Sequence, residues 1–200
     1  YARLGRLETD EQHFRDMTAV LDEAERLVEN ISKKATRTDL LDSIASAFGY
    51  AGEAGRDQNL LVRATDISRR NVKELEAEKD GDDKWNYSNA IESLASNLGR
   101  QGPGSVNILA VTREAVEVGE RAIAHSVKHF PDKISWTALI NLAASQRELF
   151  ELNGEPALLD NSIANARQSL ATFETRLREN ETVRDYNVAY ANTILAYSLA

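Results

Sequence analysis

Apolar residues recur at intervals of three and four positions along most of this chain. Between residues 87 and 98 they form one stripe with a helical period, and a second such stripe follows the next break. No segment of useful length alternates apolar and polar residues as a strand would. The pattern therefore predicts an all-α protein. The first stripe consists of Tyr87, Ile91, Leu94, Ala95 and Leu98, and the second of Ile108, Val111, Ala115, Val118, Ala122 and Ile123.

The helical stripes are interrupted by glycines that recur about every 50 residues, at Gly5, Gly55, Gly102 and Gly154. On each side of such a glycine stands an apolar helical segment, so each period predicts one helical hairpin. The predicted units are 1–37, which is partial, 38–84, 85–134, 135–184 and 185–200, which is also partial. Together they form a single helical-repeat domain over residues 1–200.

We interpret these glycines as C-terminal helix caps, because glycine adopts the left-handed conformation without steric cost. The alternative is a phosphate-binding loop at "GRQGPGS", but this stretch lacks the lysine and the preceding strand of a P-loop. Asp57 and Ser105 are expected to cap the N-termini of the second helices, and Pro156 to lie in a first turn.

Two segments carry a resemblance to a known family. "KWNYSNAIESLASNLGRQG" and "SWTALINLAASQRELFELNG" begin with an aromatic residue, continue with an Ala- and Leu-containing core and end at a glycine. They resemble tetratricopeptide repeats of a long variety. The resemblance implies an α-solenoid, a right-handed superhelix of antiparallel helix pairs. It also implies that the first helices line a concave groove that binds a peptide or partner segment.

Alignment of the units on their glycines places polar residues at equivalent positions of the first helices. Because they lie off the apolar stripe, they predict a polar ladder that faces the groove. The same residues could instead form hydrogen bonds between neighbouring repeats, and this structural reading stays open. The candidate groove residues are Asp42, Ser46, Asn89, Ser93, Arg100, Asn141, Ser145, Glu148 and Asn192.

Charge and composition narrow the classes of partner. The chain has 24 basic and 32 acidic residues and a net charge of −8, which argues against nucleic acid and anionic membranes. It has no cysteine and no apolar run long enough to span a bilayer. We therefore expect a cytoplasmic protein that binds proteins or peptides and uses no cofactor.

Histidines and tryptophans supply the remaining candidates. His125 and His129 are spaced to share a metal ion, but no third ligand stands nearby, so they are weak candidates and we predict no metal site. The acidic run 74–83 lacks the order of a calcium loop. Trp85 and Trp136 open equivalent helices, and we expect both to pack in the core.

These observations favour a protein–protein interaction scaffold and not an enzyme. One alternative is a ligand-sensing repeat section of a bacterial signalling or transcription-regulatory protein. A third is an all-helical enzyme or metal-binding protein. Because the chain begins with Tyr1 and its end units are partial, we expect a fragment of a longer protein whose other domains supply any catalysis. Uncapped end repeats would favour self-association.

Overall fold

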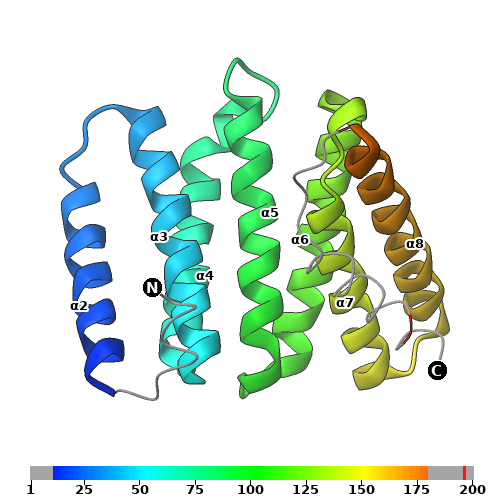
Figure 1. The fold of residues 1–200 in the computed structure, drawn as a ribbon, viewed down its shortest axis with the longest axis horizontal. Helices are drawn as coiled ribbons and strands as arrows, with labels where there is room; N and C mark the ends of the chain where they lie inside the picture. Colours follow the sequence, from blue (N-terminus) through cyan, green and yellow to red (C-terminus); the bar gives the residue numbers. More distant parts are fainter. Residues whose placement is uncertain (1–10, 180–195, 197–200) are drawn as a thin grey trace. The chain divides into compact units, whose positions relative to one another are not determined.

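The computed structural model describes residues 11–179 and residue 196, and these residues form helices and no strands (Figure 1). This confirms the all-α prediction for the described part of the chain. The α-helices are α2 (Glu11–Val28), α3 (Lys34–Gly55), α4 (Gln58–Leu75), α5 (Lys84–Gln101), α6 (Ile108–His129), α7 (Trp136–Asn153) and α8 (Pro156–Glu179). Short 3₁₀ turns follow three of them, at Glu76–Glu78, Gly102–Gly104 and Pro131–Lys133.

The chain divides into two compact units, Tyr1–Val106 and Asn107–Ala200. The division falls inside the predicted repeat 85–134. Helices α5 and α6, which the sequence predicts to form one hairpin, therefore belong to different units. Each unit is described by itself below.

In the first unit, α3 lies between α2 and α5, and α4 packs against both α3 and α5 (Figure 1). Apolar residues of α2, α3 and α4 form one core, because the stripes of α3 and α4 face each other. The core consists of Val28, Leu41, Ile44, Ala45, Phe48, Ala51, Leu60, Ala64 and Ile67.

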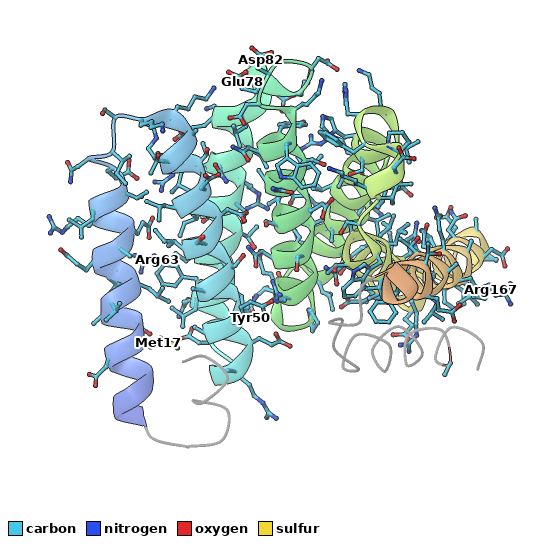
Figure 2. The ribbon with its side chains drawn as sticks, turned by 45° about the horizontal axis from the view of Figure 1, so that its top comes forward. Met17, Tyr50, Arg63, Glu78, Asp82 and Arg167 are labelled. Carbon is cyan, nitrogen blue, oxygen red and sulfur yellow. The ribbon has the colours of Figure 1, made fainter. Side chains whose placement is uncertain are left out.

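Ion pairs also join α4 to α2 in the first unit. Arg63 pairs with Asp22 and Glu25, and its guanidinium lies 4.4 Å from the centroid of the Phe48 ring (Figure 2). Exposed ion pairs contribute at most about 1 kcal/mol each, whereas burying one large apolar side chain contributes about 1.5–3 kcal/mol. Packing of residues such as Val28 therefore contributes more to holding α2 in place than the ion pairs with α4 do.

In the second unit, α7 lies between α6 and α8. Two hydroxyls of α8 donate hydrogen bonds of 2.7 Å to backbone carbonyls of α7, Ser162 to Ala143 and Ser169 to Trp136. The two helices can approach closely because small residues face each other. The apolar clusters of this unit contain Val116, Ile140, Leu142, Ala143, Leu149, Leu158 and Ala166.

The C-terminal caps follow the sequence prediction only in part. Gly154 is left-handed with φ 72°, as predicted. The prediction for Gly55 is wrong, because α3 continues through it and Arg56 takes the left-handed position with φ 54°. Gly102 is also not a left-handed cap, since its backbone stays right-handed and leads into a 3₁₀ turn. Gly5 lies outside the described residues.

The N-terminal caps are also mixed. The Asp57 carboxylate accepts hydrogen bonds from the backbone N–H groups of Asn59 and Leu60, which confirms it as the N-cap of α4. Pro156 begins α8, as predicted. The prediction for Ser105 is wrong, because α6 begins later and its N-cap is Asn107.

Candidate functional site

The first unit brings three of the predicted ladder residues together. Asp42 lies on α3, and Asn89 and Ser93 lie one turn apart on α5. Because α3 and α5 pack directly against each other, these side chains from distant parts of the sequence meet at one place. The Ser93 hydroxyl donates a hydrogen bond to the Asp42 carboxylate.

A cavity of about 170 Å³ lies between α3, α4 and α5 at this place. Its buried floor comes mainly from Asn71 and Leu75 of α4, and the exposed residues Asp39 and Asn89 stand on α3 and α5. The cavity therefore opens on the surface that α3 and α5 form together. Its lining consists of Thr38, Asp39, Asp42, Asn71, Leu75, Asn86, Asn89 and Ala90.

Asn71 supplies a buried hydrogen-bond acceptor at the floor. The residue is only 2% exposed, and its Nδ2 donates to the backbone carbonyl of Thr38 at 3.1 Å. This bond fixes which end of the amide is the donor, and it leaves Oδ1 buried with no hydrogen-bond partner. Buried acceptors of this kind are uncommon, because an unsatisfied polar atom costs about 1–3 kcal/mol.

Asp42 supplies a second acceptor. Its Oδ1 is buried and accepts no hydrogen bond. Burial raises the pKa of this carboxyl, the hydrogen bond from Ser93 lowers it, and the neighbouring charge of Asp39 raises it further. Folding thus places a carboxyl group where hydration is poor, with no basic side chain among the residues that line the cavity.

The cavity lining is polar and carries negative charge but no basic group. Its lining provides two carboxylates and three amide side chains but no lysine, arginine or histidine. A bound group with N–H donors and positive charge would satisfy the two buried oxygens of Asp42 and Asn71 together.

The other ladder residues of the first unit lie outside this cavity. Ser46 is half-buried on α3. Arg100 belongs to a separate polar cluster: it lies 3.6 Å from Glu53, donates to Asn97 Oδ1 at 3.0 Å and stacks 4.4 Å from the centroid of the Tyr50 ring. Figure 2 labels Tyr50, which lies on α3. These contacts tie α5 to α3, so Arg100 has a structural role in this unit.

The ladder residues of the second unit lie on α7. Asn141 is half-buried, while Ser145 is buried with 5% of its surface exposed. Burial raises the pKa of the half-buried Glu148, and the charge of Glu151 raises it further. Asn192 lies outside the described residues.

The two histidines lie together near the end of α6, with ring centroids 4.6 Å apart. Phe130 packs near both, at 6.3 Å from each ring centroid. Within residues 11–179 and residue 196, no group of three or more His, Asp or Glu side chains gathers to hold a metal ion. The two imidazoles and the Phe130 ring instead form an aromatic cluster.

The two tryptophans differ from the prediction and from each other. Trp136 packs edge-on against Phe173, with centroids 5.4 Å apart, and so has the expected packing role. Trp85 is 47% exposed, which contradicts its assignment to the core. It precedes Asn89, which lines the cavity, by four residues, so both lie on one face of α5.

The sequence prediction missed the buried amides Asn71 and Asn97. Asn71 follows Ile67 and precedes Leu75 by four residues each, so it stands within the apolar stripe of α4. Its place as a polar residue inside an apolar stripe is the signal by which Asn71 could have been identified from the sequence. Only the meeting of three helices shows that it lines a cavity with Asp42.

Comparison of the chain with models of protein families, with curated proteins and with solved structures gives no match. Among the helices that the structure describes, none combines the length and the apolar composition needed to cross a bilayer. The geometry of the first unit therefore has to carry any functional conclusion by itself.

Proposed function

We propose that this protein is an interaction scaffold with stacked, tetratricopeptide-like helix pairs, which binds a segment of a partner protein. In this proposal α3 and α5 are the first helices of successive repeats, and α2 and α4 are second helices. The partner segment lies along the surface that α3 and α5 form, across the mouth of the cavity.

The contacts within the first unit support the repeat assignment. Stacked helix pairs place like helices side by side. Accordingly, α3 meets α5 through Asp42 and Ser93, whereas α2 meets α4 through ion pairs such as Arg63 with Glu25 at 2.7 Å. In this proposal the contact of α3 with α5 joins two first helices, and the ion pairs of α2 with α4 join two second helices.

One observation carries the binding role: an open cavity on the α3–α5 surface contains buried oxygens of Asp42 and Asn71 that accept no hydrogen bond. Most buried acceptors in folded proteins are paired, because leaving them unpaired costs stability. Binding of a partner that donates to them recovers that cost.

The size of the cavity favours a protein segment over a free small molecule. Pockets that enclose small-molecule ligands measure about 300–1,000 Å³. This cavity, at about 170 Å³, has room for one side chain. A segment that inserts one side chain and lies across Asn89 and the exposed Trp85 fits it better than a whole metabolite does.

A selection of displayed random peptides on the purified chain tests this function. The affinity of the selected peptides is then measured for Asn89→Arg, which places a long side chain at the mouth of the cavity, and for Asn59→Arg. Asn59 is an exposed asparagine on α4, so it provides the same chemical change away from the α3–α5 surface.

We expect Asn89→Arg to weaken binding at least about tenfold, which corresponds to about 1.4 kcal/mol, and Asn59→Arg to leave it within about twofold. Circular dichroism checks that both variants stay helical. Equal affinities for the two variants, or failure to select any peptide, would contradict a binding role for this surface.

A further inference from the structure

We propose that the cavity between α3, α4 and α5 is a subsite for one lysine side chain of the bound segment. This inference rests on the proposed scaffold function and adds the chemistry that the partner must present. The ammonium group would donate to Asp42 Oδ1 and Asn71 Oδ1, with Asp39 and Asn89 at the mouth.

The buried floor of the cavity is suited to a donor. Asn71 is 2% exposed, and the hydrogen bond from its Nδ2 to Thr38 directs Oδ1 to be the end that lacks a partner. This unpaired acceptor belongs to a neutral side chain, so it adds to the two carboxylates of the lining. An ammonium group has three N–H donors and no acceptor, so it matches a floor on which only acceptors are unpaired.

The charges around the cavity also favour a positively charged group. Asp39 and Asp42 line it, and no basic residue does. The nearest basic residues of α3 are held elsewhere, because Arg37 pairs with Glu74 at 2.8 Å and Lys34 pairs with Glu78 at 2.9 Å. Figure 2 labels Glu78, in the 3₁₀ turn after α4. The protein therefore brings no cation of its own into the cavity lining.

Lysine fits this site better than arginine. Arginine binds a carboxylate most strongly through two parallel hydrogen bonds to both oxygens. The Asp42 carboxylate already accepts a hydrogen bond from Ser93 and has one buried oxygen, Oδ1, without a partner. A single-point donor such as an ammonium can use Oδ1 alone, and in this proposal a second N–H of the same group donates to the amide oxygen of Asn71.

The exposed face of Trp85 completes the subsite. Trp85 is 47% exposed and lies one helical turn from Asn89 on the same face of α5. A lysine that inserts its ammonium into the cavity has a long apolar stem, which can cover an aromatic surface at the mouth. The site therefore combines a charged floor with an apolar contact at the entrance.

A titration of the full chain with Nα-acetyl-L-lysine methylamide, followed by nuclear magnetic resonance of its amide groups, tests the inference. The norleucine counterpart of the probe has the same stem without the ammonium, and the arginine counterpart tests the preference for lysine. Asp42→Asn removes the charge at the floor. Asp66→Asn is the matched control, since Asp66 is an exposed carboxylate on α4.

We expect the lysine probe to bind with a Kd in the millimolar range and to shift the side-chain amide signals of Asn71 and Asn89. We expect Asp42→Asn to weaken it at least about fivefold, Asp66→Asn to leave it within about twofold, and the norleucine probe to cause no saturable shift. Shifts that are equal for lysine and norleucine, or that persist in Asp42→Asn, would overturn the inference. So would tighter binding of the arginine probe, or binding of Mg²⁺ or Ca²⁺ ions at the same amides in preference to lysine.

The lysine-probe titration and the peptide selection test the subsite and the scaffold function separately. If peptides selected on the chain bind the α3–α5 surface but contain no common lysine, and the lysine probe does not bind, the scaffold function stands and the subsite is refuted. If the lysine probe binds at Asp42 but no peptide is selected, the subsite stands and the scaffold function is refuted.

Discussion

Replacement of Gly49 by alanine tests how closely α3 and α5 are packed. Gly49 is buried on α3, and a Cβ atom added to it would lie less than 3.0 Å from Oδ1 of Asn97 on α5. Real Cβ atoms essentially never come so close to another atom. The Asn97 amide cannot turn away freely, because its Nδ2 donates to the Ser68 hydroxyl at 2.9 Å and its Oδ1 accepts from Arg100 at 3.0 Å.

Two opposing effects decide the sign of the change in stability. Alanine in place of glycine within a helix stabilises by about 1 kcal/mol. Displacing the Asn97 amide breaks its bond to Ser68, and because Asn97 is 1% exposed, water cannot replace that bond, at a cost of about 1–3 kcal/mol. The Arg100 bond adds about 0.5–1 kcal/mol, since that guanidinium is only partly buried. Together these values predict that Gly49→Ala lowers the free energy of unfolding by about 0.5–3 kcal/mol.

The partner substitution Asn97→Ala supplies the control. It removes the atom that a Cβ at position 49 would strike, so in this background Gly49→Ala should stabilise by up to about 1 kcal/mol. The free energy of unfolding is measured by urea titration with circular dichroism for the wild type, both single variants and the double variant. If Gly49→Ala stabilises the protein in both backgrounds, or destabilises it equally in both, the close approach of α3 and α5 at this point is refuted.

Further predictions concern the two left-handed helix ends and the buried carboxyl. Arg56→Gly should raise the free energy of unfolding by about 0.5 kcal/mol, because Arg56 has φ 54° and the relief of left-handed strain exceeds the added chain entropy of glycine. Gly154→Ala, at φ 72°, should lower the free energy of unfolding by about 1 kcal/mol. A urea titration that gives the opposite sign for either substitution would contradict this account. Asp42→Asn should raise the free energy of unfolding by about 1 kcal/mol at neutral pH. Burial and the charge of Asp39 raise the pKa of Asp42, so the native state binds this proton more tightly than the unfolded chain does. Above the pKa of the native state the ionised carboxylate therefore lowers stability, despite its hydrogen bond from Ser93. The difference should shrink as the pH falls through the pKa of Asp42 in the folded protein, and a difference that is independent of pH in the same titrations would show that the charge of Asp42 is not its cause.

The helices themselves could be predicted from the sequence because their signals are local. The stripe that contains Tyr87, Ile91 and Leu98 is buried, since a period of 3.6 residues needs no knowledge of the partner helix. The Asp57 cap was predictable for the same reason, because its carboxylate bonds to the backbone of the next residues.

The residues that were predicted wrongly depend on neighbours that are distant in sequence. Gly55 looks like a C-cap, but α3 runs one residue further and Arg56 takes the strained conformation. Trp85 looks like a core residue, yet its position at the start of α5 leaves it 47% exposed. Helical period alone cannot tell how far each helix extends or which turns its neighbours cover.

The candidate site was only half predictable. Asp42, Asn89 and Ser93 were named from the alignment of the predicted units, and the structure brings them together because α3 packs against α5. Asn71 was missed, since it lies on α4 and only the packing of α4 against α3 and α5 shows that it lines the cavity. The structure also shows that Ser93 bonds to Asp42, so the predicted ladder includes a contact between α3 and α5.

The most direct test of the central claim is site-specific photo-crosslinking of a selected peptide to the α3–α5 surface. A benzophenone amino acid replaces either Asn89 on α5 or Asn59 on α4, both of which are exposed. The account predicts a crosslinked product from position 89 that excess unlabelled peptide abolishes, and none from position 59. A peptide that crosslinks equally from both positions, or only from position 59, would show that α3 and α5 do not form the binding surface.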